Sequence, residues 1–239
     1  MSGAPEILLL PGNMCDARMW TPLRRRLDAA GLASRVADLS LDETIAGMAA
    51  RTIADAPERF IVVGFSMGAI AALELYRQAG PRVAKLGLIA CNPGADLPER
   101  AAVRPRQQAD VRAGRLTDLV ADELKPNYLA DANRGDRVLL DLTMDMATAL
   151  GPDVFMRQSE ALRLRPDLKP VLPDIACPVF LACGVEDRLC PPAWHEAIAA
   201  AVRDAELHVV PDAGHLLPLE RPDALADVLI PWLIRGTPA

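Results

Sequence analysis

The length and composition of this chain predict one folded domain, with room for a small insertion. Of its 239 residues, 51% are hydrophobic and 24% are charged. That balance can bury a large core and excludes a disordered chain. The formal net charge of −6 and the 4% of aromatic residues exclude nucleic acid as a partner, because nucleic-acid binding needs a basic surface and stacking rings.

The N-terminus and the cysteines bear on where the protein works. The first six residues hold no basic segment followed by an apolar one, and no apolar run approaches the ~20 residues of a membrane span. We therefore expect no signal peptide and no membrane segment. The five cysteines are odd in number and lack paired metal spacing, which favours a reduced, cytoplasmic location. We expect neither a metal nor a cofactor.

Strands and helices alternate over the first 95 residues. The expected strands are short apolar runs at Ile7–Leu10, Ser34–Asp38, Phe60–Val63 and Val83–Ala90. The expected helices run from Met19 to Ala30, from a cap at Asp42 to about Ala54, and from the end of the third strand to near Gly80. This alternation predicts an α/β fold with a mostly parallel sheet, right-handed crossovers and helices on both faces.

Residues 96–173 break this pattern, because they are polar, rich in Arg and Asp, and helical in period. The expected helices here are Glu99–Ala113, Leu116–Leu124, Arg137–Leu150 and Pro152–Leu164. The alternation then resumes with the strands Val179–Ala182 and Glu206–Val210 and the helices Ala193–Ala201 and Pro222–Ile234. The sequence thus predicts an α/β core of residues 1–95 and 174–239, a sheet of about six strands, and a helical insertion of residues 96–173.

A Gly-x-Ser-x-Gly pattern, Gly64-Phe65-Ser66-Met67-Gly68, follows the strongest strand and precedes a strong helix. The pattern alone is weak evidence, because it arises by chance in roughly one chain of this length in fifteen. Between strand and helix it predicts a nucleophile elbow, in which a strained backbone lifts the serine hydroxyl above the sheet edge. Side chains at 64 and 68 would collide with the neighbouring strand and helix. Ser66 is therefore the candidate nucleophile.

A serine hydroxyl needs a base to accept its proton, and the chain has only three histidines. His215 lies in a loop of small residues just after the last strand, where this kind of sheet places catalytic groups. His195 falls within a helix and His208 within a strand, so we expect them to be surface or packing residues. His215 is therefore the candidate base.

The third member of such a triad is a carboxylate that orients the imidazole. Gly184-Val185-Glu186-Asp187 follows the strand that ends at Ala182, and we prefer Asp187 over Glu186 because the turn needs a few residues to bring a carboxylate back over the sheet. An acid after the strand ending at Ala90 is the alternative. Asn92 occupies the nearest position there, and Asp96 lies further out.

An oxyanion hole needs two N–H donors aimed at the developing negative charge. One donor should be the backbone N–H of Met67, which follows the nucleophile. The other should come from the loop after the first strand, where Asn13 is expected to supply its backbone N–H while its side chain lines the pocket.

These segments resemble, in order, the motifs of the α/β-hydrolase superfamily. The run from Leu10 to Trp20 is similar to the oxyanion loop, with Pro11 where many members have histidine, and the later segments match the elbow, the acid loop and the histidine loop. The resemblance implies an α/β-hydrolase fold and assigns residues 96–173 to a helical cap. The chain begins at what would be the family's third strand, which is why we expect six strands.

Within the superfamily the chain most resembles small carboxylesterases, enol-lactonases and C–C bond hydrolases. The leading hypothesis is a serine hydrolase that cleaves a carboxylic ester, lactone or thioester of a small to medium acyl substrate through an acyl-enzyme. A C–C bond hydrolase or a cofactor-free perhydrolase would use the same triad, and a ligand-binding protein on a hydrolase fold is the non-enzymatic alternative. Six residues of the insertion are expected to line the acyl pocket: Tyr128, Leu129, Met144, Met146, Phe155 and Met156.

Overall fold

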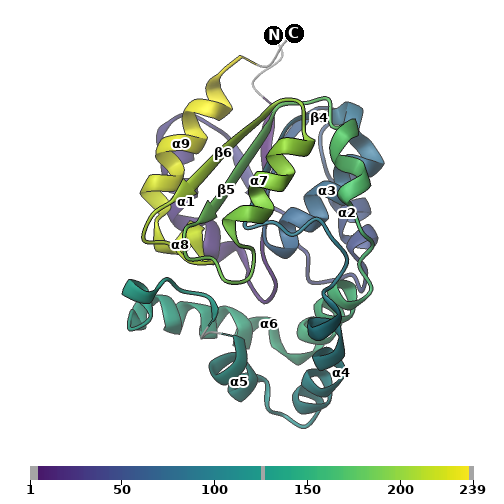
Figure 1. The fold of residues 1–239 in the computed structure, drawn as a ribbon, viewed down its shortest axis with the longest axis vertical. Coiled ribbons are helices and arrows are strands. Elements are labelled where there is room, and N and C mark those ends of the chain that lie inside the picture. The colour runs from purple at the N-terminus through teal and green to yellow at the C-terminus, as the bar shows by residue number, and fades with distance from the viewer. Residues whose placement is uncertain (1–4, 125–126, 237–239) are drawn as a thin grey trace.

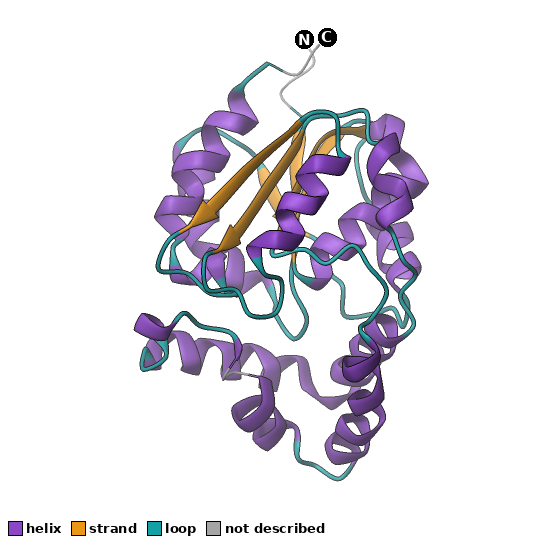
Figure 2. Ribbon diagram, viewed as in Figure 1, coloured by secondary structure: helices purple, strands orange, loops and turns teal. Residues whose placement is uncertain are grey.

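A single sheet of parallel strands forms the centre of the computed structural model, which describes residues 5–124 and 127–236. Its strands are β1 (Glu6–Leu10), β2 (Ser34–Val36), β3 (Phe60–Phe65), β4 (Val83–Ile89), β5 (Val179–Gly184) and β6 (Ala205–Val210). They follow the order β2-β1-β3-β4-β5-β6, and every neighbouring pair is parallel. The expectation of a parallel sheet of about six strands is confirmed (Figures 1 and 2).

The central strands β3 and β4 are buried along their whole length because helices cover both of their faces. Every residue of β3 and β4 is buried. Lys85 is the one cation within β4, and its ammonium donates to the carbonyls of Trp232, Leu233 and Arg235 at the end of the last helix. Those carbonyls have no acceptor role inside the helix, so the buried lysine satisfies them.

Six helices form two layers around the sheet. One layer consists of α2 (Ile45–Ala54), α3 (Met67–Ala79) and α7 (Pro192–Ala201), and the other of α1 (Thr21–Ala29), α8 (Leu217–Glu220) and α9 (Pro222–Ile234). Figure 1 shows the two layers on opposite sides of the strands. Each layer closes its own apolar core against the sheet, so the strands separate two cores rather than surround one.

Two helix starts differ from the sequence expectation. The helix α1 begins at Thr21, because Asp16 caps a short 3₁₀ turn over Ala17–Trp20 before it. The helix α2 is capped by Thr44, whose hydroxyl accepts from the N–H of Gly47 at 2.9 Å. Asp42, the expected cap, instead forms an ion pair with Arg51.

The chain between β4 and β5 is helical and contains no strand over the residues that the structure describes. It comprises α4 (Pro98–Arg112), α5 (Leu116–Leu119) with a π-helical turn over Val120–Leu124, and α6 (Arg137–Arg163). The two helices expected on either side of residue 151 form the one element α6, which breaks at Gly151 because that residue has φ 78°. Pro152 follows and starts the second half.

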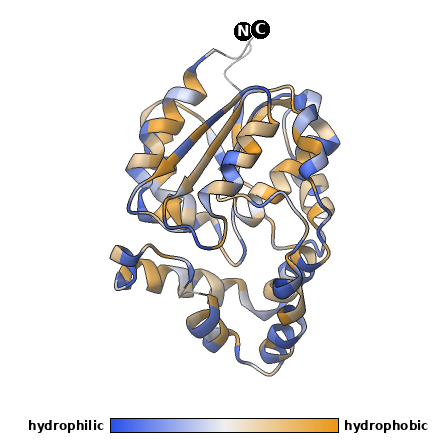
Figure 3. Cartoon of the chain, viewed as in Figure 1, coloured by the Kyte–Doolittle hydropathy of each residue, from blue (hydrophilic) through white to orange (hydrophobic). Residues whose placement is uncertain are grey.

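These helices lie across the carboxyl-terminal end of the strands, apart from the two layers (Figure 1). Many residues of α4 are hydrophilic, in contrast to the strands (Figure 3). Over the described residues, no helix has both the length and the apolar character that a membrane crossing needs.

Candidate active site

The elbow between β3 and α3 holds Ser66 in a backbone conformation that residues with a side chain rarely adopt, with φ 53° and ψ −114°. The backbone N–H of Ser66 donates to the carbonyl of Ile89 on β4 at 2.9 Å, which fixes the turn. A Cβ at Gly64 would collide with the backbone at Gly68, and one at Gly68 with the backbone of Leu10. The expectation that both positions require glycine is confirmed.

Three side chains from three loops meet at this elbow. The hydroxyl oxygen of Ser66 lies 2.9 Å from Nε2 of His215. On the other side of the ring, Nδ1 of His215 lies 2.9 Å from Oδ2 of Asp187. Their loops follow β3, β6 and β5, and the carboxyl ends of parallel strands share one sheet edge. The structure therefore brings the expected nucleophile, base and acid into one hydrogen-bonded chain.

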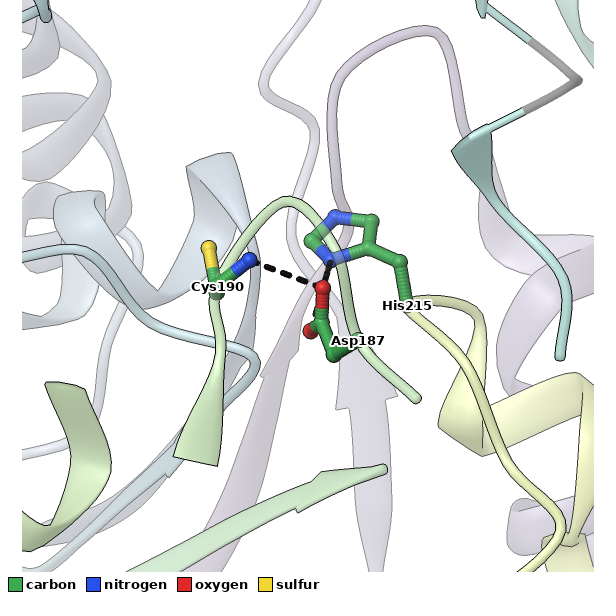
Figure 4. A group of neighbouring side chains, drawn as sticks. All are labelled: Asp187, Cys190 and His215. Carbon is green, nitrogen blue, oxygen red and sulfur yellow. Dashed lines mark hydrogen bonds and ion pairs between the residues drawn. The ribbon is translucent and has the colours of Figure 1, made fainter. Parts of the chain in front are cut away.

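Backbone donors hold the Asp187 carboxylate in place (Figure 4). Its Oδ1 accepts from the N–H groups of Leu189 and Cys190, each at 2.8 Å. Burial alone would raise the pKa of Asp187, but the imidazole of His215 and these two donors outweigh burial and lower that pKa. Asp187 is therefore an anion held on the imidazole of His215.

The loop that carries His215 packs against the loop of Asp187 and against the helical segment between β4 and β5. Gly184 permits the first contact, since a Cβ there would overlap the backbone of Ala213. On the other side, the carbonyl of Tyr128 accepts from the N–H of His215 at 2.8 Å. The carboxylate of Glu220 accepts from the N–H groups of Gly214 and Ala130 and from the amide of Asn133.

The two expected oxyanion donors lie on either side of Ser66. Met67 is the first residue of α3, so its N–H has no acceptor within the helix. Asn13 lies after β1, and its side-chain amide donates to Oε1 of Gln158 at 3.1 Å. Within the described ranges, no hydrogen bond from the backbone N–H of either residue is present.

Gln158 of α6 is a site residue that the sequence analysis missed. It is 1% exposed, and its Oε1 also accepts from the backbone N–H of Met14 at 2.8 Å, while its Nε2 donates to the carbonyl of Leu39. Met14 has a φ of 52°, so this contact stabilises an unfavourable backbone conformation beside Asn13. The sequence did not indicate this contact, because a single polar residue in an amphipathic helix is common and does not identify its partner.

Comparison with known proteins gives the family. A model of the alpha/beta hydrolase family matches residues 7–228. The chain belongs to the alpha/beta hydrolase family. It is accordingly a hydrolase enzyme.

Relatives of this hydrolase include esterases and a lactonase. It is 29% identical to the pimeloyl-(acyl-carrier protein) methyl ester esterase of Aromatoleum aromaticum, over 97% of this chain and 99% of the relative. A thermophilic esterase from Thermogutta terrifontis has the same fold, with a TM-score of 0.88 and 24% identity over 99% of this chain and 92% of the other. The enol-lactonase from Burkholderia xenovorans LB400 superposes with a TM-score of 0.82 and 24% identity, over 97% and 92%.

The alternative acid positions of this hydrolase are occupied differently. Asp96 forms ion pairs with Arg104 and Arg165. Asn92 accepts from the N–H of Gly94. Neither residue has a hydrogen bond to His215, whose Nδ1 bonds to Asp187.

The other two histidines of the hydrolase have structural partners. Nε2 of the buried His195 accepts from the N–H of Cys91 at 2.9 Å, and burial lowers the pKa of this ring, so it stays neutral. His208 lies on β6 beside Glu206 and stacks on Phe180. The expectation that both are surface or packing residues is confirmed.

A cavity of about 260 Å³ opens beside Ser66 in this hydrolase. Core residues form its floor, namely Asn13, Cys15, Phe65, Met67, Ile70, Ala90, Asn92, Leu189, Cys190, His215 and Leu216. The helical segment forms its other wall, through Arg100, Val103, Arg104, Gln107, Leu124, Asn127, Tyr128, Leu162 and Arg165.

Most of the expected wall residues lie elsewhere, and that prediction is wrong. Of the six candidates only Tyr128 lines the cavity. Leu129 and Met146 pack into the core under α1 and α9. Met144, Phe155 and Met156 pack between α4, α5 and α6. The apolar stripes of these amphipathic helices are used to hold the helices together, and a mostly polar face is left for the cavity.

One group of side chains in this hydrolase has the donor types of a metal site. Atoms of Asp187, Cys190 and His215 lie within 4.8 Å of one another (Figure 4). A thiol must lose its proton to bind a metal, but burial, and then the Asp187 charge, raise the pKa of Cys190 well above its usual value. The carboxylate is already occupied by His215 and two N–H donors. These residues therefore fit a hydrogen-bonded acid loop better than a metal site.

Proposed function

We propose that this protein is a serine hydrolase that cleaves a carboxylic ester, lactone or thioester of a small to medium acyl substrate. Ser66 is the nucleophile, His215 the general base and Asp187 the residue that orients the base. The observation that carries the proposal is the chain of contacts from Ser66 through His215 to Asp187, with 2.9 Å at each step, beside a cavity of about 260 Å³.

In the first half of the reaction, Oγ of Ser66 attacks the carbonyl carbon while its proton passes to Nε2 of His215. The carbonyl oxygen becomes an oxyanion, which accepts hydrogen bonds from the backbone N–H groups of Met67 and Asn13. When the tetrahedral species collapses, the C–O or C–S bond breaks and His215 returns the proton to the leaving group. Asp187 remains ionised and stabilises the imidazolium.

In the second half, water attacks the carbonyl carbon of the acyl-serine and gives its proton to His215. The bond from that carbon to Oγ of Ser66 then breaks, His215 returns the proton to Oγ, and the acid is released. The relatives support a reaction of this class. One is a methyl ester esterase and another is an enol-lactonase, and both names describe cleavage of an acyl C–O bond. No cofactor or metal takes part in the proposed mechanism.

We also propose that residues 96–173 act as a cap on a core of residues 1–95 and 174–239. Support comes from the position of α4, α5 and α6 across the sheet edge (Figure 1). Residues of this segment, between Arg100 and Arg165, also line the cavity beside Ser66. A cap in this position excludes water from the oxyanion contacts and strengthens them.

Gln158 is a positioning residue in this proposal, because it holds the Asn13–Met14 backbone from the cap side. Gln158→Met should lower kcat by about tenfold to a hundredfold with a smaller change in KM, since a misplaced donor weakens only the transition state. Steady-state kinetics on a p-nitrophenyl ester measure this split.

The matched control is Gln108→Met, another buried glutamine of the cap, which bonds to Ser159 and Glu160 instead of the oxyanion loop. Both variants should lose similar thermal stability, but only Gln158→Met should lose kcat. If the two variants show equal melting temperatures and equal kcat, Gln158 has a packing role alone.

The proposed function is tested by covalent labelling and an ester panel. A fluorophosphonate should label the wild-type protein once, at Ser66, as intact mass and peptide mapping report. Esters and lactones of graded acyl length should be hydrolysed, with Ser66→Ala as the blank. Absence of any adduct would contradict the serine mechanism. Slow p-nitrophenyl acetate hydrolysis beside rapid cleavage of a vinylogous diketone would indicate a C–C bond hydrolase.

A further inference from the structure

Arginines form one wall of the cavity beside Ser66, although the chain as a whole is acidic. Arg100, Arg104 and Gln107 are at positions i, i+4 and i+7 of α4, so they lie on one face of that helix. Arg165 joins them just after α6, and all four line the cavity with Ser66 and His215. No aspartate or glutamate is among the described residues that line it.

The charges of this wall are only partly neutralised. Asp96 pairs with Nε of Arg104 at 2.6 Å and with Nη1 of Arg165 at 2.7 Å. Arg165 is buried, and its guanidinium also donates to the carbonyls of Gly94, Ala95 and Leu162. Three guanidinium groups against one carboxylate leave an excess of two positive charges.

Arg100 is the guanidinium that retains donors for a ligand. It forms no ion pair with any residue in the described ranges, and its one hydrogen bond there runs from Nη2 to the carbonyl of Leu189 at 3.2 Å. Its Nε and Nη1 therefore stay available. A partly enclosed cation without a counter-ion is costly, and a planar guanidinium binds a planar carboxylate through two parallel hydrogen bonds.

Apolar side chains complete the cavity, among them Phe65, Ile70, Leu124, Leu162 and Leu216. We propose that the substrate is a small ester or lactone with an apolar stem and a separate carboxylate, which binds Arg100 with support from Arg104. This inference rests on the proposed function and names its substrate class. It adds a second recognition point, away from the bond that Ser66 attacks.

The test compares charged and neutral esters of matched size. Monomethyl adipate against methyl hexanoate places the carboxylate on the acyl side, and 4-acetoxybutanoate against pentyl acetate places it on the alcohol side. For the wild type, kcat/KM for the charged member of at least one pair should be higher by about tenfold or more, a ratio that corresponds to about 1.4 kcal/mol and is within reach of a partly enclosed charge-assisted pair. This preference should fall as salt is added.

Arg100→Gln should lower that ratio of charged to neutral kcat/KM by about tenfold, mainly through KM for the charged ester. The matched control is Arg112→Gln on the same helix, which removes an equal charge from an exposed position that lines a different depression with Glu160. It should leave the ratio unchanged.

The outcomes separate this inference from the proposed function. Hydrolysis of neutral esters and labelling of Ser66, with no preference in either pair, would overturn the inference and leave the serine hydrolase standing. If Arg100→Gln and Arg112→Gln lower the ratio of charged to neutral kcat/KM equally, the preference is a diffuse charge effect and the inference is also overturned. If no ester is hydrolysed and Ser66 is not labelled, the proposed function is overturned instead.

Discussion

Ser66→Ala should reduce kcat for ester hydrolysis by several powers of ten, roughly 10⁴- to 10⁶-fold, and abolish labelling by a fluorophosphonate. The variant removes the proposed nucleophile, and no other described hydroxyl lies against Nε2 of His215. At φ 53° the backbone strain is similar for alanine and for serine, because both have a Cβ. The fold should therefore be retained, and circular dichroism with a thermal melt checks this.

Ser159→Ala is the control for this substitution. Ser159 is a buried serine on α6, and its hydroxyl bonds to Gln108 instead of to His215. Its loss should cost some stability and leave kcat near the wild-type value. Hydrolysis retained by purified Ser66→Ala, at a rate like that of Ser159→Ala, would remove Ser66 from the mechanism.

Asp187→Asn should lower kcat by about 10⁴-fold. The asparagine carbonyl can replace Oδ1, which accepts from Leu189 and Cys190, and this leaves the amide NH₂ facing Nδ1 of His215. Because that NH₂ is a donor, Nδ1 must become an acceptor and the proton moves to Nε2. The ring then cannot accept the proton of Ser66. Initial rates, with ring-proton NMR to follow the tautomer, measure both effects.

Two neighbouring carboxylates serve as comparisons for Asp187. Glu186→Gln should be mild, because Glu186 accepts from the backbone N–H of Asp131 at the surface and forms a long ion pair with Arg188, and neither contact involves His215. Asp96→Asn should lower the melting temperature, because it leaves Arg104 and Arg165 without their counter-ion. A loss of kcat in Asp96→Asn that matches the loss in Asp187→Asn would mean that the acid follows β4.

The sheet could be predicted from the sequence because each strand is a run of apolar residues that a parallel sheet must bury on both faces. Three of the loops after these strands carry Ser66 between its two glycines, Asp187 and His215, in that order along the chain. Their meeting at Ser66 follows from topology, since the carboxyl ends of parallel strands share an edge. The glycines at 64 and 68 could also be explained from the sequence, because a tight turn between a strand and a helix leaves no room for side chains at these positions.

Contacts across the helical segment could not be predicted in this way. Helical period identifies which residues of α6 share a face, but not which face meets the cavity, and Met146 and Phe155 were therefore misplaced. The bond of Gln158 to Met14 joins residues 144 positions apart in the sequence, and no local pattern records it. The spacing of Arg100 and Arg104 is visible in the sequence, whereas their orientation toward Ser66 depends on how α4 docks.

The carboxylate of Glu220 makes the helical segment hard to exchange between enzymes. It accepts from Gly214 beside His215 and from Ala130 and Asn133 of the segment, and the carbonyl of Tyr128 accepts from His215 itself. A chimera that replaced residues 96–173 with the segment of a relative would replace one partner in three of these four bonds. New substrate ranges built on this scaffold by recombination would thus have to keep the backbone path of residues 128–133 and change side chains on α4 instead.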